Sequence, residues 1–329
     1  MKAIYLSNNL SDFKRVYSED IKKQIAQLFE IEDCCFNKDT LINSIEVEII
    51  FSTWGMPSYT HEEIKKIFPK LKAIFYSAGS VQYFAKPFLN LGIRVFSSWH
   101  ANAVPVIEYA VSQILLATKG FFLLSNMCKK SYLDAKNIMN NFKGNYNSKI
   151  GILGYGAIAK GVINELLKHK LDIYVYAPDI TKEDADKLGI NKVDNLTYIF
   201  KNCDVISNHI ANLPSTFNII NKDIINLLDN YQTFINTGRC QQVDEKALLN
   251  KLKDNPLLSA VLDVTYPEPP KQDSDYFKLD NLFITPHIAG SSGNEVIRMA
   301  EYMLLEAKRY LNKENCLYEV TLKMLERMA

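Results

Sequence analysis

The chain lacks the features by which membrane proteins and nucleic-acid-binding proteins are recognised. None of its apolar runs approaches the roughly 20 residues that a transmembrane helix needs. Its 38 basic and 37 acidic residues leave a formal net charge of +1, so no excess of charge favours nucleic acid or an anionic membrane. The first residues, MKAIYLSNNL, do not have the basic and then apolar layout of a signal peptide. We therefore expect a cytoplasmic protein.

Cysteine is scarce, and its spacing suits neither metal binding nor a redox motif. The six cysteines include no C-x-x-C pair, and adjacent cysteines are not spaced as metal ligands. We expect reduced, mostly buried thiols and no metal site. The positions are Cys34, Cys35, Cys128, Cys203, Cys240 and Cys316.

The composition is that of an ordinary globular protein, and the length suits two domains. The chain has 329 residues, of which 47% are hydrophobic and 23% are charged. Because a domain usually holds about 100–200 residues, we expect two domains, each with its own core.

Residues 149–178 have the pattern of a dinucleotide-binding unit. An apolar run at 150–153 predicts a buried strand, Gly154 to Gly156 predict a turn, and helical spacing follows from Ile158 to Leu167. A second apolar run, at 173–176, closes the unit. Strand, glycine turn, helix and strand within about thirty residues form the βαβ unit that binds dinucleotides.

The residue types in this unit fit a bound pyrophosphate. Gly154 permits the tight turn, Gly156 lets phosphates approach the backbone, and the small Ala159 lets the helix pack close to the strand. The helix that begins at Ala157 and Ile158 points unpaired N–H groups and its positive end at the phosphates. Glycine turns also join strands to helices where no ligand binds, so the inference depends on the flanking strands.

The acid that usually binds the ribose hydroxyls is missing from its expected place. An Asp or Glu is expected at the end of the second strand, where this chain has Ala177. Asp179 follows two residues later and could take its place. No Arg follows closely to hold a 2′-phosphate, and the nearest cation is Lys182. The sequence favours NAD and leaves NADP open.

Strands and helices alternate on both sides of this unit. Short β-rich runs predict strands at Lys2–Leu6, Val47–Phe51, Ala73–Tyr76, Ile93–Phe96, Val205–Ser207, Thr233–Ile235, Ser259–Leu262 and Leu282–Ile284. Helical spacing separates many of these runs, as at Ile21–Phe29, Ile219–Leu228 and Asp244–Leu252, and recurs at Glu295–Tyr310. This alternation predicts an α/β protein with parallel sheets and a doubly wound domain.

Three further segments are interpreted from their composition. Thr60 to Glu63 resemble a capping box that opens a short helix. Residues 106–123 have helical spacing and are apolar nearly all round, which is typical of a helix buried between domains or subunits. Residues 129–147 are polar and rich in Asn and predict a connecting segment.

A series of motifs, taken in order, resembles a known family. They are Ala78-Gly79-Ser80-Val81, Asn102–Glu108 (NAVPVIE), the glycine turn, Cys203–His209 (CDVISNH), Asn236-Thr237-Gly238-Arg239, Leu262-Asp263-Val264 with Glu268-Pro269, and Thr285–Gly290 (TPHIAG). At these separations the chain resembles the D-isomer-specific 2-hydroxyacid dehydrogenases. The resemblance extends from about Ser52 to Gly290.

The resemblance implies a two-domain architecture. Both domains would be Rossmann-like or flavodoxin-like parallel-sheet domains, and a doubly wound cofactor domain would be inserted in a smaller substrate domain. Residues 1–102 and 290–329 would form the substrate domain. Residues 103–289 would form the dinucleotide-binding domain. A homodimer through the apolar helix at 106–123 is implied as well.

The resemblance also implies a mechanism for a 2-oxo acid and a D-2-hydroxy acid. His287 would exchange a proton with the substrate oxygen, because an imidazole gains and loses protons near neutral pH. Glu268 would pair with His287 and favour the charged imidazolium. Arg239 would grip the substrate carboxylate through its forked donors. Each of these residues, taken alone, could equally be structural or solvated.

Further site residues are implied in the same way. Backbone N–H groups at Ala78, Gly79 and Ser80 would bind the substrate carboxylate, and Trp54 would lie beside the substrate. Asp263 would hold the nicotinamide carboxamide, or could act as a helix cap. The cofactor cleft would be lined by His209, Ile210, Thr237 and Gly238. The other histidines, His61, His100 and His169, have no supporting pattern and are interpreted as structural.

Some residues depart from the family pattern, and some questions stay open. Ala157 stands where Arg is frequent, and Cys240 follows Arg239 where Gly is usual. Aromatic residues near the substrate loops hint at an apolar or aromatic substrate, although core packing explains them equally well; they are Trp54, Tyr76, Tyr83 and Phe84, with Met56 beside them. A non-catalytic NAD-binding regulator on the same fold is the alternative. The sequence does not reveal which 2-hydroxy acid is used or the preferred direction.

Overall fold

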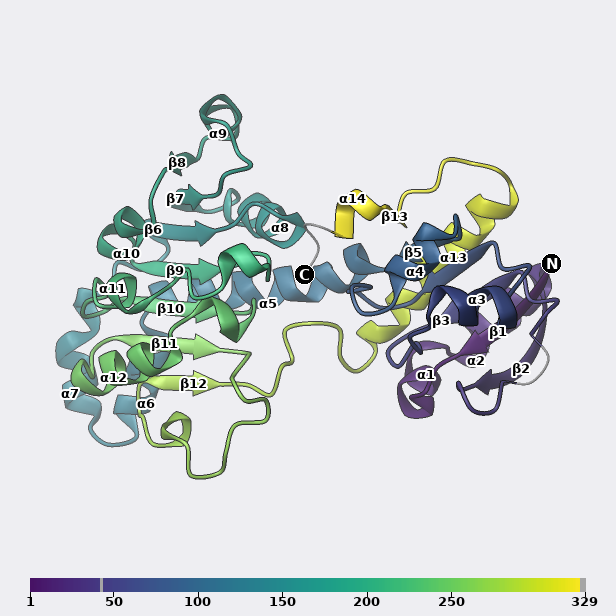
Figure 1. The fold of residues 1–329 in the computed structure, drawn as a ribbon. Coiled ribbons are helices and arrows are strands. Elements are labelled where there is room, and N and C mark those ends of the chain that lie inside the picture. Colours follow the sequence, from purple (N-terminus) through teal and green to yellow (C-terminus); the bar gives the residue numbers. More distant parts are fainter. Residues whose placement is uncertain (42–43, 326–329) are drawn as a thin grey trace. The chain divides into compact units, whose positions relative to one another are not determined.

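The computed structural model describes residues 1–41 and 44–325, and the chain divides into two compact units. The first unit comprises Met1–Ala103 with Ser291–Ala329, and the second comprises Val104–Gly290. Each unit has its own, mainly parallel sheet (Figure 1). The fold is α/β, as predicted.

The first unit contains a six-stranded sheet in the order β13-β5-β4-β3-β1-β2. All neighbouring strands are parallel except β13, which runs antiparallel to β5. Leaving β13 aside, the order is that of a flavodoxin-like sheet. The strands are β1 (Lys2–Leu6), β2 (Glu30–Phe36), β3 (Ile49–Ser52), β4 (Ala73–Tyr76), β5 (Arg94–Ser97) and β13 (Glu319–Val320).

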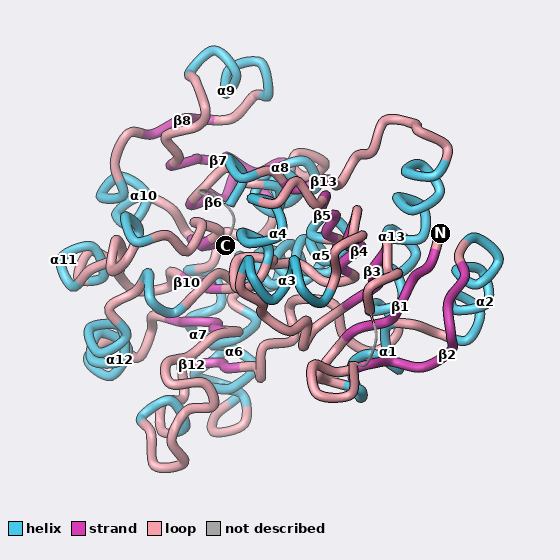
Figure 2. The backbone as a smooth tube through the Cα atoms, turned by 45° about the vertical axis from the view of Figure 1, so that its right-hand side comes forward, coloured by secondary structure: helices cyan, strands magenta, loops and turns pink. Residues whose placement is uncertain are grey.

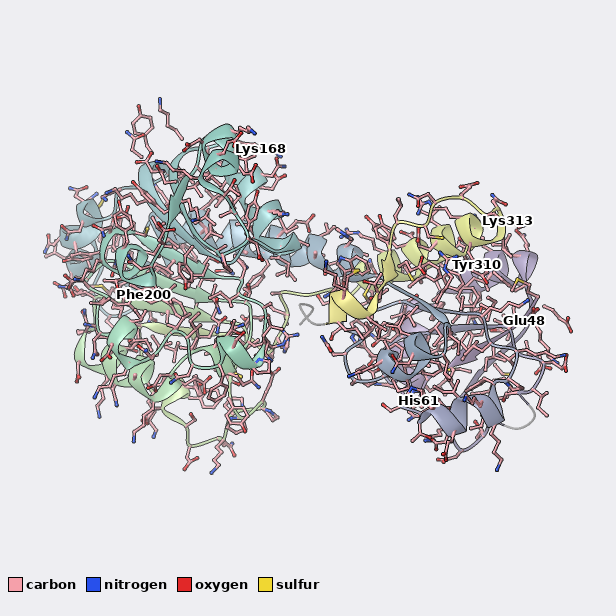
Figure 3. All side chains as sticks on the ribbon, turned by 45° about the horizontal axis from the view of Figure 1, so that its top comes forward. Glu48, His61, Lys168, Phe200, Tyr310 and Lys313 are labelled. Atoms are coloured by element: carbon pink, nitrogen blue, oxygen red, sulfur yellow. The ribbon has the colours of Figure 1, made fainter. Side chains whose placement is uncertain are left out.

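Helices pack on this sheet around an aromatic core. Phe51, Phe75 and Phe96, from β3, β4 and β5, stack in a row with ring centroids 5.3 and 4.8 Å apart. Tyr310 of the long helix α13, labelled in Figure 3, makes T-shaped ring contacts with Phe75 and Phe96. The predicted capping box at Thr60 and Glu63 is present and opens α3. The helices are α1 (Leu10–Val16), α2 (Glu19–Leu28), α3 (His61–Ile67), α4 (Ala85–Asn90), α13 (Glu295–Leu311) and α14 (Leu322–Leu325).

The second unit contains a seven-stranded parallel sheet in the order β12-β11-β10-β9-β6-β7-β8. The chain starts in the middle at β6, adds β7 and β8 on one side, and then adds β9 to β12 on the other. The direction therefore reverses between β6 and β9, the point where open α/β sheets bind ligands. The strands are β6 (Tyr146–Leu153), β7 (Lys170–Tyr176), β8 (Asn191–Val193), β9 (Val205–Asn208), β10 (Thr233–Asn236), β11 (Ser259–Leu262) and β12 (Leu282–Ile284).

Two apolar layers cover the two faces of this sheet, and they include residues of the helices α5, α8, α10 and α12, which are labelled in Figure 2. Ile235 of β10 packs in the layer that contains α5 and α8, and its neighbour Phe234 packs in the opposite layer with α10 and α12. This alternation follows from the two-residue period of a strand. The helices are α5 (Trp99–Thr118), α6 (Phe121–Cys128), α7 (Tyr132–Ile138), α8 (Ala157–Leu166), α9 (Lys182–Leu188), α10 (Leu196–Asn202), α11 (Lys222–Ile225) and α12 (Glu245–Asp254).

Three predictions about helices were wrong in detail. The single helix expected at 106–123 is two helices, because Gly120 adopts φ +66° and the Phe142 ring occupies the space of a side chain there. The helix expected at 219–228 is reduced to α11, which has four residues. The segment 129–147 contains α7, which begins after the capping residue Ser131.

Over residues 1–41 and 44–325, no single helix is both long and apolar enough to cross a membrane. Only α5 and α6 taken together pass that test of length and composition, and they are bent by 63° where they meet. In the same part of the chain, no group of three or more His, Cys, Asp or Glu residues is arranged to hold a metal ion.

Candidate functional site

The glycine turn lies at the carboxyl end of β6, where the strand order reverses. Gly154 adopts φ +95°, and a Cβ atom there would lie 2.7 Å from the carbonyl oxygen of His209. The turn therefore requires glycine, both for its backbone conformation and for its contact with the segment after β9. Gly156 begins α8 without a side-chain cap, and a Cβ atom on it would meet open space. Uncapped N–H groups that face open space fit a bound pyrophosphate.

The other residues predicted to bind the cofactor around the glycine turn differ in their exposure to solvent. Ala157, the first residue of α8, is exposed, and Ile158 is half-buried. Ala177 is 5% exposed and packs in the core, so only its backbone can face a ligand. Asp179 is exposed and has no side-chain hydrogen bond or ion pair within the described part of the chain.

The segment after β9 contacts the glycine turn, and the segment after β10 follows the next strand at the same edge of the sheet. His209 is half-buried and its Nε2 lies 2.9 Å from Ser207 Oγ. Burial lowers the pKa of His209 from 6.5 to about 4, so its imidazole is neutral at physiological pH. The hydroxyl of Thr237 is buried and has no hydrogen-bond partner among the described residues. An unpaired buried hydroxyl is costly, and a bound ligand would satisfy it.

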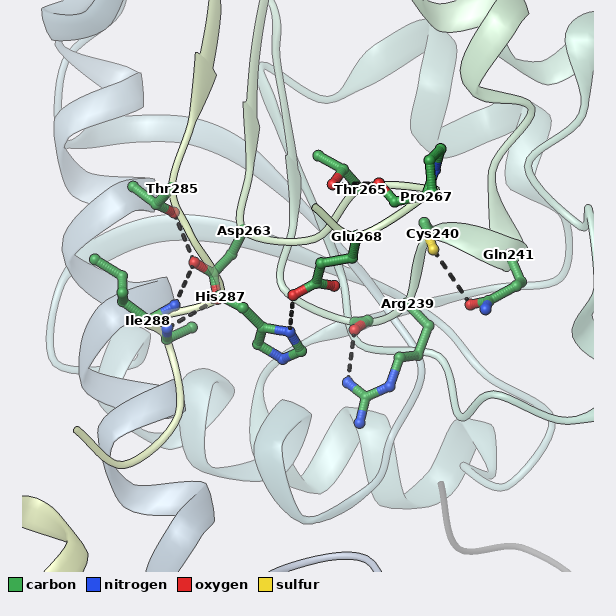
Figure 4. A network of polar contacts seen from close by, with 12 residues as sticks. Arg239, Cys240, Gln241, Asp263, Thr265, Pro267, Glu268, Thr285, His287 and Ile288 are labelled. Carbon is green, nitrogen blue, oxygen red and sulfur yellow. Dashed lines mark hydrogen bonds and ion pairs between the residues drawn. The ribbon is translucent and has the colours of Figure 1, made fainter. Parts of the chain in front are cut away.

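The side chains of His287 and Glu268 are in contact (Figure 4). His287 Nδ1 lies 2.7 Å from Glu268 Oε1, and the two side chains are 43% and 45% exposed. The contact leaves Nε2 of His287 without a partner in residues 1–41 and 44–325. His287 follows β12 and adopts φ +56°, a conformation rare for a residue other than glycine. Such backbone strain is common where a structure aims a functional side chain.

Asp263 holds the loop that carries His287. It is 2% exposed, and its two carboxylate oxygens accept hydrogen bonds from the backbone N–H groups of Ile288 and Ala289, both at 2.8 Å. Asp263 also accepts from the Thr285 hydroxyl at 2.6 Å, which in turn contacts the hydroxyl of Tyr109 on α5 at 2.9 Å. Asp263 is therefore a loop anchor in this structure. Its role toward the nicotinamide stays a prediction.

Arg239 lies in the loop after β10. Its side chain and the imidazole of His287 both point away from the ends of the strands (Figure 4). Its Nη1 donates to the carbonyl oxygen of Gly238 at 2.9 Å. Within the described residues it pairs with no carboxylate, so most of its forked donors are available. The neighbouring Cys240 is buried, which raises the pKa of its thiol, and its Sγ donates to Gln241. Cys240 is thus a protonated thiol.

Three of the predicted substrate residues of the first unit, Ala78, Gly79 and Ser80, lie in the loop after β4; Ala78 is buried, and Gly79 and Ser80 are half-buried. The carbonyl oxygens of Ala78 and Gly79 accept from the Ser97 hydroxyl at 2.9 and 2.5 Å. No backbone N–H of Ala78, Gly79 or Ser80 donates a hydrogen bond within the residues that the structure describes. Three free N–H groups in sequence fit an anion. Trp54 is half-buried, and its carbonyl oxygen accepts from Ser7.

Not every predicted aromatic residue is available to a ligand. Met56, Tyr76 and Phe84 are at most 2% exposed and belong to the core of the first unit. Core packing is therefore sufficient to explain these three. Trp54 is half-buried and Tyr83 is exposed, so both keep accessible surface.

One group of residues in the second unit was missed by the sequence reasoning. Asn208, Asn236 and Gln242 are buried and bonded to one another beneath Gly238. The sequence carried a partial signal, because Asn208 and Asn236 are polar residues that end strands predicted to be buried. Their mutual contact is tertiary and cannot be read from the spacing.

Comparison with known proteins adds three findings. The family model described as the NAD binding domain of D-isomer specific 2-hydroxyacid dehydrogenase matches residues 111–289. A D-3-phosphoglycerate dehydrogenase from Methanocaldococcus jannaschii is 29% identical over 292 residues, which is 88% of this chain and 54% of that protein. One from Haemophilus influenzae is 32% identical over 72% of this chain and 58% of its own length. The chain thus spans little more than half the length of these relatives.

Solved structures share the fold at low sequence identity. The apo D-mandelate dehydrogenase of Rhodotorula graminis has a TM-score of 0.79 at 17% identity, covering 97% of each chain. A D-2-hydroxyisocaproate dehydrogenase has a TM-score of 0.75 at 20% identity, covering 98% of this chain and 100% of its own. Because the family model matches more than half of the sequence, this chain belongs to the D-isomer specific 2-hydroxyacid dehydrogenase family, whose NAD-binding domain it carries.

Proposed function

We propose that the protein interconverts a small 2-oxo acid and its D-2-hydroxy acid with a nicotinamide cofactor. The observation that supports this most is the contact between Glu268 and Nδ1 of His287, which leaves Nε2 of His287 free. Arg239, whose guanidinium pairs with no carboxylate in the described residues, lies beside this imidazole in Figure 4. A proton donor next to a carboxylate-binding group is what reduction of a 2-oxo acid needs.

The residues of the glycine turn would hold the cofactor. Its pyrophosphate would bind at Gly154, Gly156 and the first N–H groups of α8, where the helix has no side-chain cap. Thr237 would use its unpaired hydroxyl, and His209 and Ile210 would line the cleft as neutral groups. When bound, the nicotinamide supplies the hydride for reduction or accepts it for oxidation.

Arg239 would bind and polarise the substrate. Its fork can place two parallel hydrogen bonds on a carboxylate, and the substrate would take the place that no acidic side chain fills. We propose that the free N–H groups of Ala78, Gly79 and Ser80 also bind the substrate carboxylate. The first unit, Met1–Ala103 with Ser291–Ala329, would thus serve as the substrate domain, and Val104–Gly290 as the cofactor domain.

His287 would move the proton. During reduction its Nε2 would donate a proton to the substrate oxygen as negative charge develops there. Glu268 would fix the ring through Nδ1 and stabilise the positive charge that the imidazole carries before transfer. In the oxidation direction the same nitrogen would accept the proton.

The substrate we propose carries an apolar or aromatic side chain and no phosphate. The two sequence relatives above are named for a phosphorylated acid. Yet the loops at 52–58 and 77–84 of this chain contain no Lys or Arg that would bind a phosphate. Trp54 keeps accessible surface in the first of these loops and would contact the substrate side chain.

For the cofactor we propose NAD. Asp179 is exposed and free of intramolecular side-chain bonds, and it follows β7 closely enough to accept from ribose hydroxyls. A carboxylate there would also repel a 2′-phosphate. Replacement of Asp179 by Ala should therefore weaken the preference for NADH over NADPH.

A panel of 2-oxo acids, assayed with NADH and with NADPH, tests the proposal. We expect oxidation of NADH with an apolar or aromatic 2-oxo acid and a lower rate with phosphorylated acids. If the protein binds NADH, seen by its fluorescence, but oxidises it with no acid of the panel, the alternative of a non-catalytic NAD-binding regulator replaces the enzyme.

A further inference from the structure

A cluster of buried amide side chains lies directly beneath the loop that carries Arg239. Asn208 ends β9, Asn236 ends β10, and Gln242 ends the short 3₁₀ helix η3 (Cys240–Gln242). Asn208 and Asn236 are opposite each other in the register of the two strands. Their exposed fractions are 0%, 2% and 0%, so all three amides are removed from water.

The amides bind one another through Asn208. Its Nδ2 donates to Gln242 Oε1 at 2.7 Å and to Asn236 Oδ1 at 3.0 Å, so both protons of this amide are used. A buried amide group is costly unless it is bonded, and here the three satisfy each other. Loss of one member would leave the others with unpaired donors or acceptors.

The same amides bind the backbone of two separate segments. After β9, Ile210 donates its N–H to Asn208 Oδ1 at 3.2 Å, and its carbonyl oxygen accepts from Gln242 Nε2 at 2.6 Å. After β10, Gly238 donates its N–H to Asn236 Oδ1 at 3.0 Å, and the carbonyl oxygen of Arg239 accepts from Asn236 Nδ2 at 3.4 Å. The cluster therefore joins the loop of Arg239 to the segment that contacts the glycine turn.

Gly238 is packed against all three amides. A Cβ atom on Gly238 would lie 3.1 Å from Gln242 Oε1, 3.2 Å from Asn208 Nδ2 and 3.3 Å from Asn236 Oδ1. The side chain of Arg239 has a single bond within the described residues, to the carbonyl oxygen of Gly238. The orientation of its guanidinium thus depends on how the backbone at Gly238 is held.

We propose that Asn208 and Gln242 are positioning residues that fix the Arg239 loop for substrate binding. This inference rests on the proposed function of Arg239 as the carboxylate-binding group. Apolar side chains of the same size would fill the same space and cost less desolvation. They would, however, remove the hydrogen bonds to the backbone of Ile210, and they would remove the bond that holds Asn236, which accepts from Gly238. The cluster therefore supplies backbone hydrogen bonds that apolar side chains could not make.

Isosteric apolar variants separate this role from simple core packing. In Asn208→Leu, Gln242 and Asn236 lose a partner, so we expect a lower unfolding temperature and a KM for the 2-oxo acid raised about tenfold or more. In the double variant Asn208→Leu/Gln242→Met, part of the lost unfolding temperature should be regained, because both partners are then apolar and Gln242 no longer leaves an unpaired amide group. KM should stay raised, with the change in kcat much smaller.

Gln232 provides a matched control. Like the cluster, it is a buried amide. Unlike the cluster, its side chain bonds to backbone groups alone among the described residues, accepting from Asp229 and donating to Phe200 and Cys203. It precedes β10, whereas Arg239 follows that strand. Gln232→Met should lower the unfolding temperature and leave KM for the 2-oxo acid within about twofold.

Hydrogen exchange of the backbone amides at 237–242, followed by mass spectrometry, gives a readout that does not need turnover. Exchange at Gly238 should become faster in Asn208→Leu and in the double variant, and should stay unchanged in Gln232→Met. Unchanged exchange, or a double variant with wild-type KM, would overturn the positioning role. If the wild type oxidises NADH with no 2-oxo acid, the proposed function fails, while the exchange measurement still decides the positioning of the loop.

Discussion

At the scale of single residues, the contact between His287 and Glu268 is better suited to chemistry than to stability. Both side chains are more than 40% exposed, and exposed ion pairs contribute only ~0–1 kcal/mol to folding. Yet His287 adopts φ +56°, and the buried Asp263 bonds the two residues that follow it. The structure thus holds the backbone of His287 in a disfavoured conformation, and the exposed contact with Glu268 offsets little of that cost.

His287→Ala should therefore lower kcat by about 10²- to 10⁴-fold, because the proposed proton donor is lost. The unfolding temperature should change little, and NADH should still bind, as measured by its fluorescence. Glu268→Gln should lower kcat less, since the imidazole stays but loses the carboxylate that contacts its Nδ1. Normal turnover in His287→Ala would show that another group moves the proton.

Arg239→Lys tests the shape of the proposed carboxylate-binding group at constant charge. A lysine presents a point charge and cannot place two parallel bonds on a carboxylate. We expect KM for the 2-oxo acid to rise about tenfold or more while the affinity for NADH is kept, measured by steady-state kinetics and fluorescence titration. Retention of the wild-type KM would remove Arg239 from the substrate site.

His209 makes the stability of the protein depend on pH. Burial lowers its pKa from 6.5 to about 4, so the unfolded chain takes up a proton before the folded one. The stabilisation is complete above pH 6.5 and is lost as the pH falls toward 4. At pH 5 the loss is at most about 2 kcal/mol, less because the residue keeps some exposure.

The drop in unfolding temperature between pH 7 and pH 5 should therefore be smaller in His209→Gln than in the wild type. His169 is exposed at the surface and provides the control, because His169→Gln should leave that drop unchanged. An equal drop in His209→Gln would mean that this imidazole titrates as it does in water.

At this scale, the sequence allows a site residue to be predicted only where its residue type and local motif already suggest a role. Histidine, arginine and glutamate stand out in motifs, and the structure does bring Glu268 and His287 into contact. Asp263 was given a role toward the cofactor, but its bonds to Ile288 and Ala289 appear only once β11 and β12 lie side by side. Asn208 and Gln242 were missed for the same reason, since they are 34 residues apart in the chain.

At the scale of elements, strands were predictable where they are buried. The runs that form β1, β3, β4, β9, β10, β11 and β12 were found, because strands covered on both faces are continuously apolar. The strand β2 was missed because it lies at the edge of its sheet, where most of its side chains are exposed and polar. The break between α5 and α6 was missed because it depends on Phe142, whose ring lies over Gly120.

The end of α13 depends on a buried carboxylate. Glu306 is 0% exposed and accepts from the backbone N–H groups of Leu317 and Tyr318 at 2.9 and 3.0 Å, and from Arg309 at 2.5 Å. These bonds tie the segment before β13 to the helix. Glu306→Ala leaves two backbone donors and a partly exposed guanidinium without this partner, and should cost ~1–3 kcal/mol of stability.

Denaturant unfolding measures this loss, with Glu301→Ala as the control. Glu301 lies on the same helix but is exposed, so its replacement should change the free energy of unfolding by less than about 0.5 kcal/mol. If both variants unfold alike, Glu306 does not anchor the segment.

At the scale of the whole molecule, the helices α5 to α7 carry exposed apolar side chains, which are typical of a surface that another protein chain covers. Tyr132 and Leu133, at the start of α7, are 70% and 67% exposed, and Phe121 of α6 is 48% exposed. The sequence predicted a homodimer through residues 106–123, and α6 and α7, which pack together, extend that surface. We propose that a second copy of the chain covers it, because such a patch is unfavourable in water.

Glutamate substitutions at Tyr132 and Leu133 should weaken this dimer. Each apolar side chain that is buried contributes about 1.5–3 kcal/mol, so the double variant should raise the dissociation constant by at least about 100-fold. Light scattering after size exclusion, at micromolar protein, would show the wild type as a dimer and the variant as a monomer. Phe217→Glu is the control, because Phe217 is 68% exposed in the same unit but lies outside these helices. A monomeric wild type, or a variant that remains dimeric, would place the contact between copies elsewhere or remove it.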